Sequence, residues 1–239
     1  MKEHIYTIPI NEAFEQDSFC PFCYIREKLE RDAVEYTLGP AMMEPDFRIM
    51  TNEKGFCQKH MRDLHGLRNA LSLSLIAETH LRSVDEFFEG IICPEKKSLF
   101  KKEKSKKATA VEKLKKLSNS CAVCDKIENT FSAYLDTFVF MLKTEKGFTE
   151  RVLEKDGFCM EHFALIAERA YDKLSDAEFE KFFVPIAKKQ KERVEKYTSD
   201  IKCFADSFDY RNAGKPLAVP KDTLLKTGYL LNGEFEPKF

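Results

Sequence analysis

The chain has 239 residues, of which 43% are hydrophobic and 33% are charged, with 21 Phe, no Trp and only 9 Gly. A chain of this length can bury one substantial core or two smaller ones, so it does not need a metal merely to rescue a tiny domain. Its low Gly content and many charged residues favour helices over sheet. No run of about 18 apolar residues is present, and the N-terminus lacks the apolar centre of a signal peptide. We therefore expect no membrane span and a cytoplasmic location, where thiols stay reduced.

The first predicted helix begins at a CxxC pair, Cys20-Pro-Phe-Cys23. Apolar residues follow the pair at spacings of three and four: Ile25, Leu29, Ala33 and Tyr36. This spacing is typical of an amphipathic helix. Gly39-Pro40 and Pro45 then interrupt the pattern and separate this helix from the next.

A Cys-x-x-His pair begins the second predicted helix, in the sequence Gly55-Phe-Cys57-Gln-Lys-His60. Residues at i and i+3 share a helix face, so Cys57 and His60 are predicted to point the same way. Gly55 would let the chain turn tightly into the helix. Further helical spacing follows at Leu64, Leu67, Leu71 and Leu75.

A lysine-rich stretch, residues 94–120, separates the two halves of the chain. It holds ten Lys and three Glu, a local charge of +7, which leaves −8 on the remainder because the whole chain carries −1. We interpret it as a solvated linker. Binding of nucleic acid through this stretch is the less favoured alternative.

The same cysteine and histidine pattern then occurs again. Cys121-Ala-Val-Cys124 is followed by Gly157-Phe-Cys159-Met-Glu-His162. The CxxC and CxxH pairs are separated by 33 residues in the first copy and 34 in the second. Helical spacing follows each pair: Ile127, Phe131, Leu135, Phe138 and Leu142, then Phe163, Ile166, Ala170 and Leu174.

The similarity extends beyond these motifs. Val84–Cys93 and Val194–Cys203 match without a gap as Val-acid-x-aromatic-x-x-x-Ile-x-Cys. The segment from the CxxH cysteine to this last cysteine is eight residues longer in the second copy than in the first. We place the insertion at Ser175–Glu178, which resembles a capping box, and expect Pro185 to kink the following helix or mark its first turn.

The sequence thus predicts an all-α protein built as a tandem duplication of a helical module, a bundle with pseudo-twofold symmetry. The C-terminal tail is predicted to wrap a core, with a short helix capped by Asp222. The expected parts are a first metal-binding repeat (1–93), the Lys-rich linker (94–120), a second metal-binding repeat (121–205) and the tail (206–239).

Each copy supplies three thiols and one imidazole, which is a set of ligands suited to tetrahedral zinc. We expect one Cys3His site per copy: Cys20, Cys23, Cys57 and His60 in the first, and Cys121, Cys124, Cys159 and His162 in the second. A CxxC pair at a helix start lies near the positive end of the helix dipole, which favours thiolates. Each metal would then clamp two helix N-termini and stabilise the fold.

Alternatives remain at these sites. Iron–sulfur clusters with one His ligand each, and thiol–disulfide chemistry at the CxxC pairs, both use the same residues. Cysteines can also serve as small buried hydrophobic residues, and this is the favoured interpretation of Cys93 and Cys203.

The paired CPxC and GFCxxH motifs are followed by Phe-Asp-Tyr-Arg-Asn (208–212) and Pro-Lys-Asp-Thr (220–223). This combination resembles an uncharacterised bacterial domain-of-unknown-function family over nearly the whole chain. The resemblance implies a bacterial cytosolic protein and supports these eight Cys and His residues as the positions of the family's motif, without naming a substrate.

No nucleophile elbow, phosphate-binding loop, zincin helix or dinucleotide fingerprint is present, so no catalytic residue is assigned. We expect a non-enzymatic zinc-binding protein that presents a surface to an unknown protein partner. An enzyme or sensor that uses thiolates is the competing hypothesis.

Overall fold

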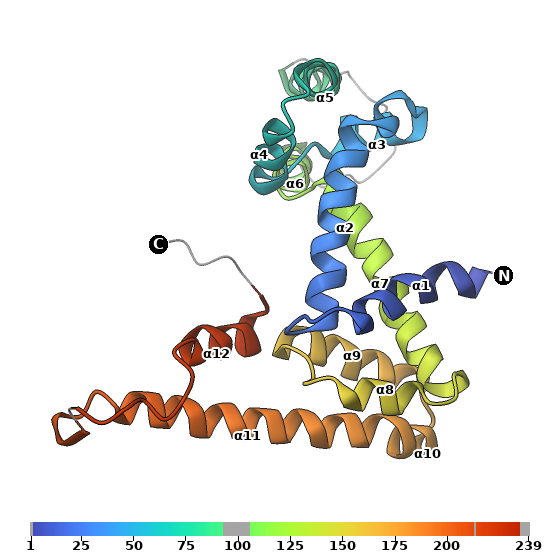
Figure 1. Cartoon of the computed structure of the whole chain (residues 1–239). Coiled ribbons are helices and arrows are strands. Elements are labelled where there is room, and N and C mark those ends of the chain that lie inside the picture. The colour runs from blue at the N-terminus through green and yellow to red at the C-terminus, as the bar shows by residue number, and fades with distance from the viewer. Residues whose placement is uncertain (1, 93–105, 213, 235–239) are drawn as a thin grey trace. The chain divides into compact units, whose positions relative to one another are not determined.

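The computed structural model describes residues 2–92, 106–212 and 214–234, and this part of the chain contains helices and turns but no strand. The all-α prediction is confirmed (Figure 1). The α-helices and shorter helical turns are α1 (Lys2–Glu15), α2 (Pro21–Leu38), a 3-10 turn (Pro40–Met43), α3 (Pro45–Lys54), α4 (Gln58–Gly66), α5 (Ala70–Ile92), α6 (Lys106–Ser118), α7 (Ala122–Thr144), α8 (Phe148–Glu154), α9 (Met160–Lys173), α10 (Asp176–Glu178), a π-helical turn (Phe179–Phe183), α11 (Val184–Asp206), a 3-10 turn (Tyr210–Asn212) and α12 (Thr223–Asn232).

The chain divides into two compact units that do not follow the order of the sequence. The terminal unit comprises Met1–Glu27 and Phe131–Phe239, and the central unit comprises Lys28–Thr130. Helices α2 and α7 each begin in one unit and end in the other. The division therefore cuts through the first helix of each predicted repeat.

An aromatic cluster forms the core of the terminal unit. Phe22, at the start of α2, makes edge-to-face contacts with Phe131 and Phe138 of α7, at centroid distances of 5.7 and 5.4 Å. Phe14 and Phe158 complete the cluster around Phe138. Helix α11 lies along one side of this unit, where it contacts α8 and α12 (Figure 1).

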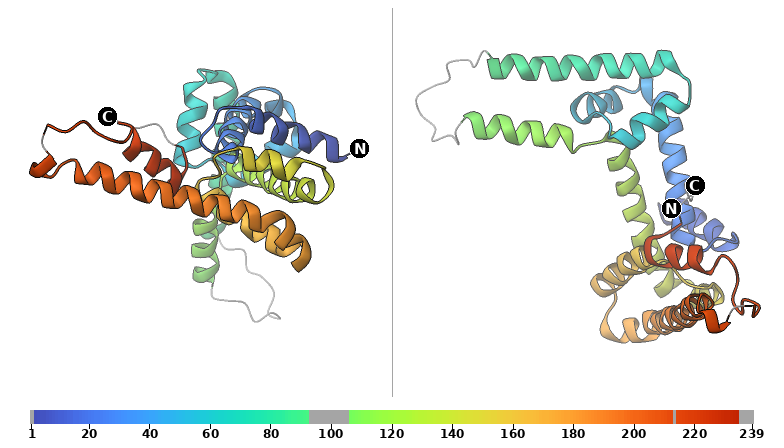
Figure 2. Two further views of the ribbon diagram at one scale, coloured as in Figure 1. Left: turned by 60° about the horizontal axis from the view of Figure 1, so that its bottom comes forward. Right: turned by 90° about the vertical axis from the view of Figure 1, so that its left-hand side faces the viewer.

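The core of the central unit is aliphatic. It consists of buried residues from α2, α4, α5 and the start of α7: Ala33, Val34, Leu38, Leu64, Ile76, Cys121, Val123 and Ile127. Helices α3 and α4 both contact the long helix α5 (Figure 2).

The apolar spacing after the first CxxH pair is not one helix face. Helix α4 ends at Gly66, Arg68 adopts a positive φ of 55°, and α5 begins at Ala70. Leu64 is fully buried, but Leu71 is 71% exposed. The turn changes the helix direction, so the predicted continuous face is wrong beyond Leu64. After the second CxxH pair the prediction holds, because Ile166, Ala170 and Leu174 are all buried.

Several local predictions are confirmed. Pro40 and Pro45 begin the 3-10 turn and α3. Ser175 and Glu178 form the capping box of α10, and Pro185 occupies the first turn of α11.

Other local predictions need correction. Within the predicted linker, residues 106–118 form α6, a helix that was not predicted from the sequence, while residues 94–105 lie outside the described part of the chain. Asp222 precedes α12 as expected but makes no capping hydrogen bond, since its carboxylate pairs with Lys226 at 2.9 Å. Helices α3 and α8, which precede the two CxxH helices, were not predicted.

No helix in the described ranges combines the length and apolar character needed to cross a bilayer.

Candidate metal centres

The two CxxC pairs lie at the starts of α2 and α7. Cys20 directly precedes α2, and its carbonyl accepts a hydrogen bond from the Cys23 backbone N–H at 3.0 Å. Cys121 directly precedes α7, and its Sγ accepts from the Cys124 N–H at 3.5 Å. Both thiol pairs therefore lie at the positive end of a helix dipole, as the sequence predicted.

The two CxxH pairs begin α4 and α9 with nearly identical backbone geometry. Cys57 and Cys159 are the N-cap residues, with φ/ψ of −70°/165° and −70°/162°. His60 and His162 follow one turn later and are buried. Gly55 and Gly157 both have positive φ, at 59° and 117°, which confirms the predicted tight turns.

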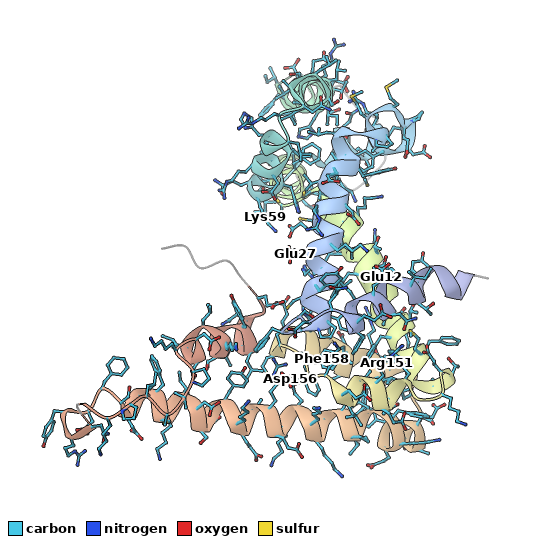
Figure 3. All side chains as sticks on the ribbon, viewed as in Figure 1. Glu12, Glu27, Lys59, Arg151, Asp156 and Phe158 are labelled. Atoms are coloured by element: carbon cyan, nitrogen blue, oxygen red, sulfur yellow. The ribbon has the colours of Figure 1, made fainter. Side chains whose placement is uncertain are left out.

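Each of these glycines is also in close contact with a side chain of a later helix, α5 for Gly55 and α11 for Gly157. A Cβ on Gly157 would lie 2.7 Å from the Gln190 Oε1 atom, and one on Gly55 would lie 2.4 Å from the His80 Nε2 atom. Gln190 accepts from the Phe158 N–H at 3.0 Å and donates to the Phe158 carbonyl at 2.9 Å. Figure 3 labels Phe158 in this loop beside α11. Gln190 thus fixes the loop that carries Cys159, a role the sequence did not reveal.

The eight predicted ligands form two clusters, but each cluster combines half-sites from both sequence repeats. Cys20, Cys23, Cys159 and His162 form one cluster, here named the terminal site because it lies in the terminal unit. Cys57, His60, Cys121 and Cys124 form the other, named the central site. The expected pairing within each repeat is therefore wrong, although the ligand set of three thiols and one imidazole is retained.

Helix length explains the exchange. Helix α2 has 18 residues and is about 27 Å long at about 1.5 Å per residue. It carries the chain away from Cys20 and Cys23, and α3, with only 10 residues, spans only about 15 Å. The same holds for α7, with 23 residues, and α8, with 7.

The distances between ligand atoms fit a tetrahedron around zinc. Zn–S bonds of about 2.3 Å and Zn–N bonds of about 2.0 Å imply tetrahedral edges of about 3.8 Å between sulfurs and about 3.5 Å between sulfur and nitrogen. In the terminal site Cys20, Cys23 and Cys159 Sγ lie 3.5, 3.4 and 3.2 Å from His162 Nδ1, and Cys23 Sγ lies 3.8 Å from Cys159 Sγ.

The central site has the same geometry. The Sγ atoms of Cys57, Cys121 and Cys124 each lie 3.3 Å from His60 Nδ1. Cys57 Sγ is 3.9 Å from Cys124 Sγ. A disulfide would need about 2.05 Å. Both clusters thus have the spacing of metal ligands and not that of oxidised pairs.

Proximity also perturbs the acidity of the ligands. Burial, together with contact with Cys121, raises the pKa of Cys124 to about 12. Hydrogen bonding to Cys159 raises the pKa of Cys23, while hydrogen bonds from Cys20 and Cys23 lower the pKa of Cys159. A dication bound at either cluster would displace protons from these thiols, because thiolates are the metal ligands.

The terminal site is covered by the C-terminal end of the described chain. The Glu234 backbone N–H donates to Cys23 Sγ at 3.5 Å, and the Glu234 Oε1 atom accepts from the Phe19 N–H at 3.2 Å. Gly233, with φ of 83°, approaches so closely that a Cβ would lie 3.4 Å from Cys23 Sγ. The predicted wrapping tail therefore covers the terminal site.

Backbone contacts join the two halves of the central site. The Ala122 N–H donates to the Gly55 carbonyl at 3.0 Å, and the Ser120 hydroxyl donates to the Lys54 carbonyl at 2.8 Å. Lys54 also forms an ion pair with Asp125 in the first turn of α7. These contacts hold the CxxC and CxxH segments together independently of a metal.

The two remaining cysteines lie outside these clusters or outside the described structure. Cys203 is half-buried in α11 and belongs to neither site. Cys93 lies outside the described residues.

No curated protein and no solved structure matches the chain. A family model does match residues 1–238, which is nearly the whole sequence, in agreement with the resemblance inferred from the motifs. The two Cys3His clusters, with their shared helix-start geometry, are thus features of a chain that belongs to the family of unknown function DUF6062.

Proposed function

We propose that this protein binds two zinc ions, one in the terminal site and one in the central site, as structural metals of a helical scaffold. The observation that carries the proposal is the agreement of both ligand sets with the edges of a zinc tetrahedron. Three thiolates and an imidazole favour zinc over the harder cations, which prefer oxygen ligands.

The proposed role of the metals is to hold helix starts together. The terminal site joins the starts of α2 and α9, and the central site joins those of α4 and α7. Four protein ligands complete a tetrahedral shell and leave no position for a substrate, which supports a structural role over Lewis-acid catalysis.

The proposal also covers the evolutionary origin of the two sites and the cellular compartment of the protein. A duplicated helical module whose half-sites were exchanged between copies would produce two sites of the same composition. Unoxidised thiols in both clusters suit a reducing compartment, so we place the protein in the cytoplasm, where the scaffold presents its surface to a protein partner.

Elemental analysis of the purified full chain, combined with its visible absorption spectrum, tests the metal assignment. We expect about two zinc ions per chain and no visible absorption. The Cys203→Ser variant is the matched control and should keep both ions, because Cys203 lies outside the clusters. Brown, iron-containing protein would replace the zinc assignment with iron–sulfur clusters, and metal-free protein with disulfides would overturn both.

A further inference from the structure

The two sites differ at one matching position of their CxxC helices. Glu30 lies seven residues after Cys23 on α2, and Phe131 lies seven residues after Cys124 on α7. Because the half-sites are exchanged, each of these residues contacts the histidine of the site in its own unit: Glu30 contacts His60 and Phe131 contacts His162. The two histidines consequently have different environments.

In the central site, a carboxylate holds the outer nitrogen of the histidine. Glu30 Oε1 lies 3.0 Å from His60 Nε2, while His60 Nδ1 faces the three thiols. An ionised carboxylate accepts only, so Nε2 carries the proton and the lone pair of Nδ1 is directed toward the thiols. Such carboxylate–histidine pairs orient the ring and increase its basicity as a metal ligand.

Lys59 also forms an ion pair with the Oε1 atom of Glu30, the same oxygen that faces His60. Figure 3 labels Lys59 at the start of α4. A glutamate carboxyl is ordinarily ionised at neutral pH, so the carboxylate that holds His60 does not depend on Lys59 for its charge.

In the terminal site, the corresponding position supplies an aromatic ring. The Phe131 and His162 ring centroids are 5.3 Å apart, and Phe22 lies on the same histidine at 6.2 Å. The His162 Nε2 atom is buried and has no hydrogen-bond partner within the described residues. His162 is thus held by apolar contact alone on this side.

We infer that Glu30 is a positioning residue of the central site, which acts on the metal through His60, and that the two metal sites are inequivalent for this reason. The inference rests on the proposed zinc binding. Loss of such a carboxylate partner typically weakens metal affinity by about 10- to 100-fold. Only the central site should respond to changes at Glu30.

The test measures Co²⁺ and Zn²⁺ affinity by competition with a chelator. It compares the wild-type chain with Glu30→Gln, which keeps the shape and removes the charge, and Glu30→Leu, which removes the hydrogen bond as well. The three proteins are also compared in a Cys20→Ser/Cys159→Ser background, in which only the central site keeps four ligands. Circular dichroism verifies that each variant is folded.

We expect the metal affinity of the central site to be highest in wild type, lower in Glu30→Gln and lowest in Glu30→Leu, with a total loss of about 10- to 100-fold. The thiolate-to-cobalt absorption of that site should also shift. The terminal ion should be retained. Lys59→Met is the matched control: it removes the other partner of Glu30 but leaves His60 its carboxylate, so affinity should not fall.

Two results would contradict the inference in distinguishable ways. Two bound ions with unchanged central affinity in Glu30→Gln and Glu30→Leu would overturn the role of Glu30 and leave the zinc scaffold intact. Failure of the wild-type chain to bind either metal would overturn the proposed function itself.

Discussion

At the scale of single residues, the ligands have similar backbone settings, but the residues around them differ. Cys57 and Cys159 have nearly the same backbone angles, and each follows a glycine of positive φ. Partly exposed Cys23 of the terminal site lies beneath Gly233 and Glu234. The C-terminal segment should therefore slow the loss of metal from the terminal site.

Replacing Gly233 with Val should open this cover. A Val Cβ would lie 3.4 Å from Cys23 Sγ and 3.8 Å from Cys159 Sγ before its methyl groups are added, and the backbone angles of 83° and 168° are allowed almost only for Gly. We expect the terminal ion to be lost several-fold faster to a chelator, with a strain of about 1 to 3 kcal/mol.

Gly214→Val is the matched control for this variant. Gly214 has the same φ of 83°, but nothing lies within 4 Å of its Cβ position. Equal rates of metal loss in the two variants would show that strain alone, and not the cover over the thiols, controls release.

At the scale of elements, the start of a helix is determined by residues that are close together in the sequence. The capping box of α10 is complete: Glu178 Oε2 accepts from the Ser175 N–H and hydroxyl, both at 2.9 Å, and Lys143 pairs with Glu178 Oε1 at 3.2 Å. Hydrogen bonds from Ser175 and then from Lys143 lower the pKa of Glu178. The π-helical turn and Pro185 follow directly and lead into α11.

This lowered pKa predicts a pH dependence of stability. A carboxyl whose pKa is lower in the folded state stabilises the fold above its ordinary value of 4.5, and this stabilisation is lost as pH falls through the folded-state pKa. Glu178→Gln should therefore unfold at lower urea concentration than wild type at neutral pH, and the difference should shrink in acid.

The effect is measured by urea unfolding of wild type and Glu178→Gln. Both proteins are unfolded at the same series of pH values, so that loss of metal in acid affects both alike. Ser175→Ala, which removes the other residue of the capping box, should lower the free energy of unfolding by about 1 kcal/mol. A difference between wild type and Glu178→Gln that persists unchanged at low pH would show that the carboxylate charge is not the stabilising factor.

At the scale of the whole molecule, the exchange of half-sites makes each compact unit depend on both ends of the duplicated sequence. The terminal site needs a CxxC from residues 20–23 and a CxxH from 159–162, and the central site needs 57–60 and 121–124. Removing one repeat would thus damage both sites.

Two double variants distinguish this pairing from pairing within repeats. Cys20→Ser/Cys159→Ser alters only the terminal site, so the chain should keep about one zinc ion. Cys20→Ser/Cys57→Ser alters both sites, so it should keep few or none. Zinc content measured after exhaustive buffer exchange decides between them, and the reverse result would restore the pairing expected from the sequence.

The sequence was sufficient for the features that depend on neighbouring residues. The 3.6-residue periodicity gave the helices after each CxxC pair, the spacing of Cys and His gave all eight residues of the two clusters, and Gly55 and Gly157 gave the turns. These features are local, so they require no knowledge of the rest of the fold. The periodicity failed at Leu67–Leu75, where α4 ends at Gly66 and the turn at Arg68 separates it from α5.

Only the tertiary structure decided which half-sites meet and what surrounds them. Equal spacing in the two copies is compatible with either pairing, and the choice depends on rigid helices that carry the chain too far from its own CxxC pair to return. The contact of Glu30 with His60, the cover of Gly233 over Cys23 and the clamp of Gln190 on Phe158 all join residues at least 30 positions apart. A single sequence identifies the residues of both clusters, because their spacing is local chemistry, but long-range packing determines how they combine.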